Sequence, residues 1–389
     1  MPDAKRIFLT GGTGFLGSHL AQALLEKGNR VIVLARKSTS QTARQRVVEV
    51  LGRVSSGQLG KTVAERLEVL EGDVSLPLLG LDPSAYDYIH RHVEEVWHSA
   101  ASLSFLEDDR QEIFRMNVDG TRQVLALASG TGPRRLHHIS TAYVAGSRTG
   151  IVREDELDVG QTFRNPYEAS KCEAEKLLRA AHESGAVRAT IYRPSIVIGN
   201  SVSGKATHFH GVYAFIRGLW AVTRRLRQGN PGSDFVDLSL RIRGSETSTL
   251  NFVPIDFVVS AIMELAGVPV SGVARTFHLT NPVPTPNWLW LGVVCRQLRV
   301  RGIRLAEEKD FEDEPMTRME ALFHRQMTFY SPYLSTEPVF DRSAIEDALS
   351  TGAIRCPYVT QEFAAKMTGW YIDLLNGARE GQTAAGEQA

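Results

Sequence analysis

The first half of the chain alternates short apolar runs with stretches of helical periodicity. The apolar runs are RIFLT, VIVLA, LEVLEGDV, EEVWHSAA, RLHHIST and ATIYRPSIVIG, and a helix is expected from Phe15 to Lys27. Continuous apolar strands separated by helices are typical of βαβ units, in which both faces of a parallel sheet are buried. The pattern therefore predicts an α/β fold with a doubly wound parallel sheet of the Rossmann type.

This pattern ends after about Gly199, where a second, smaller lobe of mixed segments is expected. An Arg-rich helix is followed by a strand-like LNFVPI, a helix from Asp256 to Leu265, a strand at TFHLTN and a helix at TPNWLWLGVVCRQL. Thr285 is expected to cap the last of these helices. The expected organisation is a Rossmann domain over 1–199 with returning segments near 250–282, a smaller mixed lobe over 200–375, and a disordered tail over 376–389.

Composition and charge exclude several classes of protein. The 389 residues are 43% hydrophobic and 23% charged, as in an ordinary globular protein. Lys plus Arg equals Asp plus Glu at 44 each, so no overall field draws the chain to nucleic acid or to an acidic membrane surface. The three cysteines show no metal spacing, and no apolar run approaches the roughly 20 residues of a membrane span. We expect a cytoplasmic protein without signal peptide, membrane span, nucleic-acid partner or metal.

A cluster of glycines lies between the first strand and the first helix, in IFLTGGTGFLGSHL. Gly11, Gly14 and Gly17 follow a TGxxGxxG spacing, which allows a tight turn, close approach of a pyrophosphate, and packing of the helix on the strand. The N-terminus of the helix would face the phosphates of a dinucleotide. A tight turn with only a structural purpose is the alternative, although the strand-to-helix position is the context that the motif requires.

The end of the second strand discriminates between dinucleotides. An NAD site usually offers an acidic residue there, whereas this chain has Leu34, Ala35, Arg36 and Lys37. The guanidinium of Arg36 would suit a 2′-phosphate by charge and shape, which predicts NADP(H). The alternative is a solvated basic loop.

The stretch NPYEASKCEAEKLL places Tyr167 and Lys171 four residues apart at the start of a helical pattern. Both side chains then lie on one face, and the ammonium can approach the phenol oxygen. A neighbouring cation lowers the pKa of a tyrosine, which makes it a usable proton donor or acceptor. YxxxK alone also occurs by chance in many helices.

Two hydroxyl residues, Ser140 and Thr141, end the strand RLHHIST. Either hydroxyl could hydrogen-bond a substrate carbonyl oxygen, but successive strand side chains face opposite ways, so only one can point to the cofactor. Hydroxyl residues at strand ends are more often turn formers than catalysts.

The order of these motifs resembles the extended short-chain dehydrogenase/reductase superfamily, from about Ile7 to Leu279. The series is the glycine loop, the basic residues after the second strand, GDV, HSAA, MNVDGT, IST, YxxxK and RPSIVIG. The stretches RLEVLEGDVSLPLLGLD, VWHSAASLSF, NVDGTRQVL, HHISTAYVAG and ARQRVVEVL are most like the thioester reductase and fatty acyl-CoA reductase branch, with its male-sterility-type NAD-binding domain. Beyond Gly199 the chain departs from the best-known acyl-CoA reductases, which leaves the substrate open.

The resemblance implies roles for individual residues. Thr141, Tyr167 and Lys171 would form the catalytic set with Asn117 as a supporting relay, and Ser140 would replace Thr141 if the strand register were shifted by one. Asp73 and Val74 would lie against adenine, and residues 194–196 against nicotinamide. The expected cofactor-binding residues are Thr10, Gly11, Thr13, Gly14, Phe15, Leu16, Gly17, Arg36, Lys37, Asp73, Val74, Ser99, Ala100, Ala101, Ser140, Tyr167, Lys171, Pro194, Ser195 and Ile196.

The activity that the resemblance implies is NADPH-dependent reduction of an acyl thioester, on CoA or a carrier protein, or of the derived aldehyde. Residues 1–199 would bind NADP(H), and 200–375 would mainly hold the substrate. An NAD(P)-dependent sugar-nucleotide epimerase or dehydratase, or a hydroxysteroid-type ketone reductase, is the alternative, and a non-enzymatic dinucleotide sensor is a third. The resemblance also suggests a homodimer.

Further polar residues have simpler explanations. Cys172, beside Lys171, is expected to be a buried packing residue. Five histidines have no third partner at metal spacing and are expected on helix or strand surfaces: His90, His92, His98, His137 and His138. The Arg-rich helix presents either a solvated basic face or a surface for the phosphates of CoA or a phosphopantetheine carrier, through Arg217, Trp220, Arg224 and Arg227.

Overall fold

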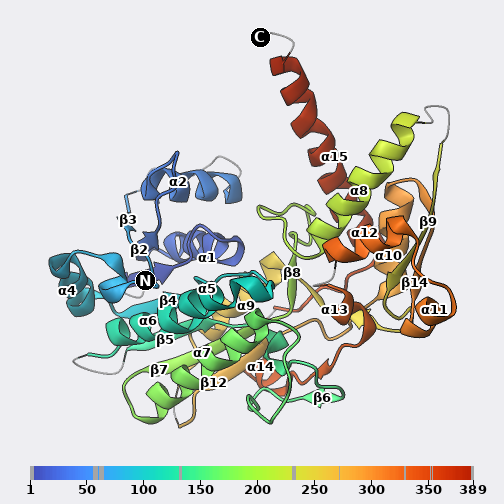
Figure 1. Ribbon diagram of the computed structural model, residues 1–389. Coiled ribbons are helices and arrows are strands. Elements are labelled where there is room, and N and C mark those ends of the chain that lie inside the picture. The colour runs from blue at the N-terminus through green and yellow to red at the C-terminus, as the bar shows by residue number, and fades with distance from the viewer. Residues whose placement is uncertain are drawn as a thin grey trace. The chain divides into compact units, whose positions relative to one another are not determined.

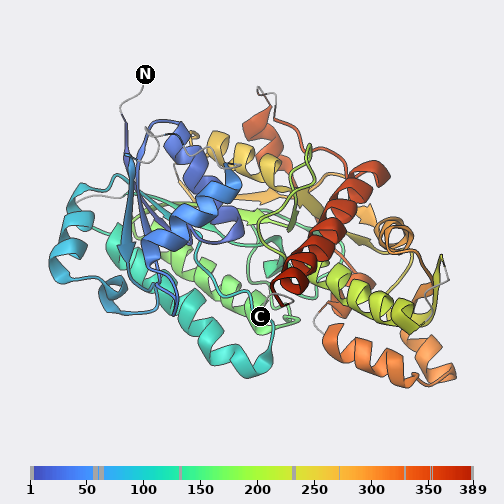
Figure 2. The ribbon, with the colours of Figure 1, turned by 90° about the horizontal axis from the view of Figure 1, so that it is seen from above.

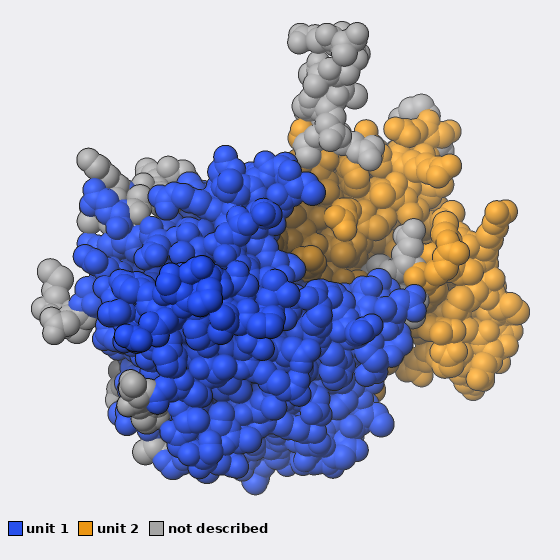
Figure 3. Space-filling view, turned by 60° about the vertical axis from the view of Figure 1, so that its left-hand side comes forward, with its two compact units in different colours: residues 1–195, 255–280, 338–355 blue, residues 196–254, 281–337, 356–389 orange. Residues whose placement is uncertain are grey.

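The computed structural model of the chain describes residues 4–55, 60, 65–130, 134–229, 234–270, 272–327, 330–350, 352 and 354–386. The chain forms two compact units, each assembled from three segments (Figure 3). Unit 1 comprises 1–195, 255–280 and 338–355, and unit 2 comprises 196–254, 281–337 and 356–389. The sequence pattern places a division near 199 and a return near 250–282. The third segment of unit 1, 338–355, is not anticipated by the sequence pattern.

Unit 1 contains a seven-stranded sheet in the order β12-β7-β5-β4-β1-β2-β3 (Figure 1). Its strands are β1 (Arg6–Thr10), β2 (Arg30–Ala35), β3 (Leu67–Glu71), β4 (Glu95–His98), β5 (Arg135–Ile139), β7 (Arg188–Pro194) and β12 (Arg275–Leu279). All neighbouring strands are parallel. The strand order reverses between β1 and β4, and open α/β sheets bind ligands beyond the carboxyl ends of the strands at such a point. The predicted doubly wound Rossmann fold is confirmed.

Helices cover both faces of the sheet (Figures 1 and 2). Against one face pack α4 (Pro83–His92), α6 (Gly120–Ala128) and α7 (Pro166–Glu183). On the other face lie α1 (Phe15–Glu26), α2 (Ala43–Val54), α9 (Ile255–Leu265) and α14 (Ser343–Leu349). No helix of the described residues is long and apolar enough to cross a membrane.

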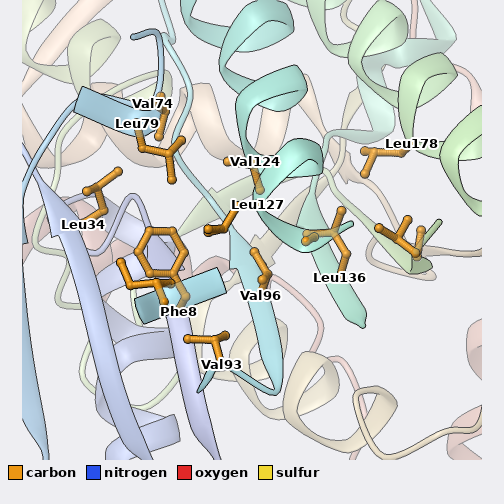
Figure 4. Packing of buried hydrophobic residues seen from close by; sticks show 14 of the residues in the cluster. Phe8, Leu34, Val74, Leu79, Val93, Val96, Val124, Leu127, Leu136 and Leu178 are labelled. Carbon is orange, nitrogen blue, oxygen red and sulfur yellow. The ribbon is translucent and has the colours of Figure 1, made fainter. Parts of the chain in front are cut away.

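The core of unit 1 follows from the alternation of side chains along the strands. Phe8 faces α4, α6 and α7, whereas its neighbours Ile7 and Leu9 are buried on the side of α1. Figure 4 shows the cluster on the Phe8 side, with Leu34, Val74, Leu79, Val93, Val96, Val124, Leu127, Leu136 and Leu178. Each buried apolar side chain contributes about 1.5–3 kcal/mol, so continuous apolar strands are stable only when helices cover both faces.

Short elements complete unit 1. They are η1 (Pro77–Gly80), η2 (Glu107–Asp109), α5 (Arg110–Phe114), the π-helical η3 (Arg115–Asp119), η4 (Ala142–Ala145), β6 (Ile151–Val152) and β15 (Val339–Phe340). β15, from the third segment, pairs in parallel with β6, which joins residues far apart in the sequence.

Unit 2 is a mixed unit of short strand pairs and helices. Its strands β8 (Ile196–Ile198), β9 (Val236–Arg243), β10 (Thr249–Leu250), β11 (Phe252–Pro254), β13 (Thr285–Pro286) and β14 (Val300–Ala306) form the pairs β8–β11, β9–β14 and β10–β13. Its helices are α8 (Val212–Gly229), α10 (Asn287–Gln297), α11 (Glu308–Asp313), α12 (Arg318–Met327), α13 (Ser331–Ser335) and α15 (Gln361–Gly386).

Two local expectations for unit 2 differ from the structure. Thr285 does not cap α10, because it pairs with Leu250 in β13 and Pro286 takes the N-cap position without a side-chain hydrogen bond. The segment expected to be a disordered tail, 376–389, continues α15 as far as Gly386. Residues 387–389 lie outside the described part of the chain.

A buried ion pair joins α7 to β7. Arg193 Nη2 lies 2.7 Å from Glu175 Oε2, and both side chains are inaccessible to solvent. Arg193 also donates to the carbonyl oxygen of Glu156 at 2.8 Å, and the hydroxyl of Ser140 donates to Glu175. Although burial alone would raise the pKa of Glu175, the guanidinium and the hydroxyl hold that pKa below its usual value.

Breaking this pair from one side should destabilise the protein strongly. Glu175→Leu leaves the Arg193 guanidinium buried without its counter-ion, which typically costs about 3–5 kcal/mol of unfolding free energy. The double variant Glu175→Leu, Arg193→Met should recover most of that loss, since apolar pairs often replace buried ion pairs at little cost. Urea unfolding followed by circular dichroism measures both. If the double variant were no more stable than Glu175→Leu alone, the loss of stability could not be attributed to the unpaired Arg193 guanidinium.

Candidate active site

The glycine loop joins β1 to α1 and runs close to the backbone that follows β4. Gly11 has a φ of +76°, and a Cβ placed there would lie 2.5 Å from the nitrogen of Ala100. A Cβ on Gly17 would lie 2.1 Å from the carbonyl oxygen of Gly11. Both positions require glycine because the backbone of the loop, of α1 and of the segment after β4 are in direct contact.

The N-terminus of α1 fits an anion. Its N-cap residue, Gly14, makes no side-chain capping hydrogen bond, and the first turn contains no acidic residue. The first N–H groups of the helix and the positive end of its dipole are therefore not used by an acidic side chain of that turn. Thr13, Phe15 and Leu16 are partly exposed beside Gly14. These residues could hold the pyrophosphate of a dinucleotide.

The basic residues after β2 lie beside acidic residues of the neighbouring strand and its loop. Arg36 Nη1 is 3.7 Å from Asp73 Oδ2, and Lys37 Nζ is 3.1 Å from Glu71 Oε1. Both cationic side chains are more than half exposed. Arg46 of α2 donates to the carbonyl oxygen of Arg36, which places a second guanidinium at this end of β2.

Other expected cofactor residues lie at the carboxyl ends of the central strands. Ser99, Ala100 and Ala101 follow β4 and are partly exposed. Val74 differs, because its side chain is buried in the core cluster of Figure 4. Pro194 ends β7 and Ser195 follows it in unit 1, with its N–H donating to the Leu279 carbonyl at 3.3 Å, whereas Ile196 begins β8 in unit 2.

Ser140 and Thr141 face different partners after the end of β5. The Ser140 hydroxyl donates to Glu175 of the buried ion pair, whereas the Thr141 side chain hydrogen-bonds Tyr167. Thr141 Oγ1 also accepts from the N–H of Tyr143 at 3.2 Å, which fixes its rotamer. The structure thus brings Thr141, and not Ser140, to the phenol.

Tyr167 lies in the first turn of α7. Asn165 caps this helix, because its side chain accepts from the N–H of Glu168 at 3.0 Å. Burial raises the pKa of Tyr167 above its ordinary value, and the Thr141 hydrogen bond offsets only part of that rise. The expectation of a lowered pKa is therefore wrong, because burial outweighs the hydrogen bond, and the phenol is protonated at neutral pH.

The Lys171 ammonium points to β5. Its Nζ donates to the carbonyl oxygen of Ile139 at 2.7 Å and lies 3.3 Å from Nε2 of His138. The side chain is buried, and burial lowers the pKa of Lys171 to about 8, although Glu175 on the next turn acts in the opposite direction. A group with this pKa changes its charge close to physiological pH.

Asn117 lies in the π-helical turn η3, between α5 and α6. Its Oδ1 accepts from the N–H of Ser102 at 2.7 Å, and its Nδ2 donates to Ser170 Oγ at 2.8 Å. Ser170 in turn donates to the carbonyl oxygen of Tyr167 at 2.8 Å. Single π-helical turns are frequent at functional sites, and this one connects the loop after β4 to the helix that carries Tyr167.

Three of the five histidines are buried, so the expectation of surface positions is wrong for His98, His137 and His138. They lie on strands β4 and β5, whose two faces are covered by helices. Side chains on these strands are therefore buried even when they are polar, as an imidazole is. The described residues contain no group of three or more His, Cys, Asp or Glu able to hold a metal ion. Cys172 is buried against Val144, as expected of a packing residue.

His98 belongs to a hydrogen-bond chain that sequence reasoning missed. Thr121 Oγ1 donates to the carbonyl oxygen of Asn117 at 2.6 Å and lies 3.2 Å from His98 Nε2. His98 Nδ1 lies 2.8 Å from Thr10 Oγ1, which accepts from the N–H of Ala100 at 3.3 Å. Because Thr121 has one hydroxyl proton, His98 must donate from Nε2 and accept at Nδ1. Burial and the Lys171 ammonium lower the pKa of His98 to about 3, which agrees with this neutral tautomer.

The basic helix of unit 2, α8, has its own partners. Arg224 stacks over the ring of Trp220 at 5.4 Å, and the indole N–H of Trp220 donates to Asn376 at 3.0 Å. Arg227 donates to the carbonyl oxygen of Leu298, at the end of α10, at 2.7 Å. These contacts favour a structural role for Arg227, and Arg217 is the exposed cation of the set.

Known proteins resemble this chain in sequence. Residues 9–262 match the model of a family described as male sterility protein. The PKS-NRPS hybrid synthetase acdB of Aspergillus candidus is 30% identical over 267 residues, which cover 68% of this chain and 10% of that synthetase. The chain thus spans about a tenth of the length of this curated relative.

Solved structures of reductase domains share the fold. The terminal R domain from the myxalamid PKS-NRPS biosynthetic pathway has a TM-score of 0.78 and 26% identity, and the match covers 96% of this chain and 92% of that one. A thiolation-reductase di-domain from an archaeal non-ribosomal peptide synthetase has a TM-score of 0.73 at 20% identity, over 96% of this chain and 76% of that one.

The contact between α1 and the glycine loop should make Gly17 intolerant of a side chain. Gly17→Ala places a methyl group against the Gly11 carbonyl and should cost about 1–3 kcal/mol of unfolding free energy by overpacking. Gly52→Ala is the matched control in α2, where a Cβ has open space and should stabilise by about 0.5–1 kcal/mol. Thermal melting of both variants tests the contact. Equal stability of the two would refute it.

Proposed function

The chain belongs to the male sterility protein family, an NAD-binding branch of the extended short-chain dehydrogenase/reductases, and from this we propose that it is an NADPH-dependent reductase of acyl thioesters. The substrate is an acyl group on a carrier protein or CoA, or the aldehyde derived from it. The observation that carries the proposal is the hydrogen bond between Thr141 and Tyr167, at the same end of the sheet as the glycine loop and Lys171.

The residues of unit 1 fit a nicotinamide dinucleotide. The uncapped start of α1 and the close turn at Gly11 suit the pyrophosphate. Arg36 suits a 2′-phosphate, with Arg46 beside it, and the phosphate would replace Asp73 as the partner of the Arg36 guanidinium. When bound, a reduced nicotinamide supplies a hydride to a carbonyl carbon.

Tyr167 acts as the proton donor. Its raised pKa keeps the phenol protonated, so it can transfer that proton to the carbonyl oxygen as negative charge develops there. Thr141 is held by Tyr143 and stabilises the same oxygen with a hydrogen bond. From a thioester, the resulting hemithioacetal collapses to an aldehyde and a free thiol. Lys171, with a pKa near 8, holds positive charge beside the reacting groups at neutral pH.

The similarity to reductase domains of peptide and polyketide synthetases supports a carrier-bound substrate. Unit 2 would hold the acyl group, and the exposed Arg217 of α8 is a candidate contact for the phosphate of a phosphopantetheine arm. A cytoplasmic location stays a prediction. The homodimer has no support among the comparisons and is not part of the proposal.

The cofactor preference should depend on Arg36. Arg36→Ala should weaken NADPH binding about tenfold or more and leave NADH binding nearly unchanged, because a charge-assisted hydrogen bond contributes about 1.5–3 kcal/mol. Arg53→Ala, which removes an exposed guanidinium from α2, is the control and should change neither affinity. Fluorescence titration with both cofactors measures the preference. Equal affinities of the unmodified protein for NADPH and NADH would refute the NADP(H) assignment.

The proton donor can be tested on the proposed substrates. A panel of acyl-CoA, acyl-carrier and aldehyde substrates, followed by NADPH absorbance and product mass, should show net NADPH consumption. Tyr167→Phe keeps the ring, loses the proton, and should lower turnover by about 10² or more while NADPH still binds. Conversion of a sugar nucleotide without net NADPH consumption would instead favour an epimerase. Near-normal turnover of Tyr167→Phe would rule out Tyr167 as the acid.

A further inference from the structure

The Lys171 ammonium is held at two of its three N–H donors. One donates to the carbonyl oxygen of Ile139 at 2.7 Å, and a second points to His138 Nε2 at 3.3 Å. These are the hydrogen bonds of Lys171 within the described residues. Because the ammonium nitrogen is tetrahedral, fixing two of its N–H bonds also fixes the direction of the third. The orientation of that N–H therefore depends on both partners.

His138 can accept from Lys171 in only one tautomer. It is fully buried on β5, and burial together with the Lys171 ammonium holds its pKa well below the usual value, so the imidazole is neutral. A charged lysine donates and cannot accept, so Nε2 of His138 carries the lone pair and Nδ1 carries the proton. The described residues offer Nδ1 no hydrogen-bond partner.

An unpartnered buried donor is a cost to folding. An apolar side chain at position 138 would not leave such an N–H. His138 accepts a hydrogen bond from Lys171 although its own Nδ1 has no partner. Its histidine side chain therefore benefits Lys171 and not the packing of the core. Positions that lower stability in this way are expected at functional sites.

The other groups around Lys171 do not replace this acceptor. His98 of β4, whose ring lies 5.1 Å from that of His138, has both nitrogens engaged by Thr10 and Thr121. Glu175, one turn further along α7, is held by Arg193 and Ser140. Tyr167, one turn earlier, hydrogen-bonds Thr141. Of these titratable neighbours, His138 is the one with a free lone pair at the ammonium.

We propose that His138 is a positioning residue for Lys171. Its Nε2 accepts a hydrogen bond from the charged ammonium, stabilises that charge in a buried environment, and with the Ile139 carbonyl fixes the direction of the remaining N–H. The catalytic consequence rests on the proposed reductase function, whereas the effect on the ionisation of Lys171 does not.

Two variants separate this role from a packing role. His138→Leu removes the acceptor and the unpartnered donor, and His138→Gln keeps an amide oxygen that can accept from Lys171. His137→Leu is the matched control, because His137 is a buried histidine on the same strand that hydrogen-bonds Tyr192 and faces away from Lys171. All three are made in the full chain.

The first measurement is the titration of Lys171, by NMR of the protein labelled with ¹³C at lysine Cε and assigned with Lys171→Arg. Loss of an acceptor disfavours the ammonium, so His138→Leu should move the titration about one pH unit below that of the unmodified protein. His138→Gln should restore most of the shift, and His137→Leu should show none. The melting temperature of His138→Leu should be no lower than that of the unmodified protein.

The second measurement is function. In His138→Leu, kcat at pH 7.5 should fall about tenfold, as expected for loss of a hydrogen bond to a charged group, and its alkaline limb should move to lower pH with the Lys171 titration. NADPH affinity, read by fluorescence, should become more pH-dependent over the same range. His138→Gln should recover most of kcat.

An unchanged Lys171 titration in His138→Leu would overturn the proposal, and if that variant does not fold, an unchanged titration and pH profile in a folded His138→Asn would do the same. A destabilised but kinetically normal His138→Leu would reveal a packing role and also refute it. If the unmodified protein reduces neither thioesters nor aldehydes, the reductase assignment fails, while the Lys171 titration still decides the role of His138.

Discussion

The buried ion pair between Glu175 and Arg193 anchors the helix that carries Tyr167 and Lys171. It fixes α7 to β7, the second strand from one edge of the sheet, and Tyr167 and Lys171 are carried on the preceding two turns of the same helix. The pair also binds the hydroxyl of Ser140, so the next residue, Thr141, faces the phenol. One electrostatic contact in the core thus sets the register of a helix and the orientation of a strand end.

The central strands were predictable because their apolar runs leave few alternatives. A parallel sheet covered on both faces requires such runs, and β1, β2 and β5 follow them closely. The glycine loop was predictable because its backbone contacts leave no room for a Cβ at Gly11 or Gly17, so the sequence must contain glycine at both positions. The family resemblance is confirmed by a match over residues 9–262.

Electrostatic details of the site were not predictable from spacing. The i to i+4 relation correctly puts Tyr167 and Lys171 on one helix face, but it contains no information on β5, whose Ile139 carbonyl and His138 imidazole attract the ammonium. Solvent exposure is likewise a tertiary property, so the buried positions of His98 and His138 could not be deduced from their neighbours in sequence. The third segment of unit 1, 338–355, could not be recognised in the sequence. Its strand β15 contains only two residues, which is too short for a periodic pattern of apolar residues.

The division of unit 1 into three segments has a consequence for synthesis. β7 pairs with β5 on one side and with β12 on the other, and β12 follows it after residues 195–274 of the chain. While the nascent chain is being extended over those residues, β7 is an open edge of the sheet, with unpaired N–H and C=O groups available to other chains. Arg193 near the end of β7 is paired with Glu175 of α7, which precedes β7 in the chain, so this charge faces the covering helix and not the open edge. The sheet is therefore complete only after the first segment of unit 2, residues 196–254, has been made.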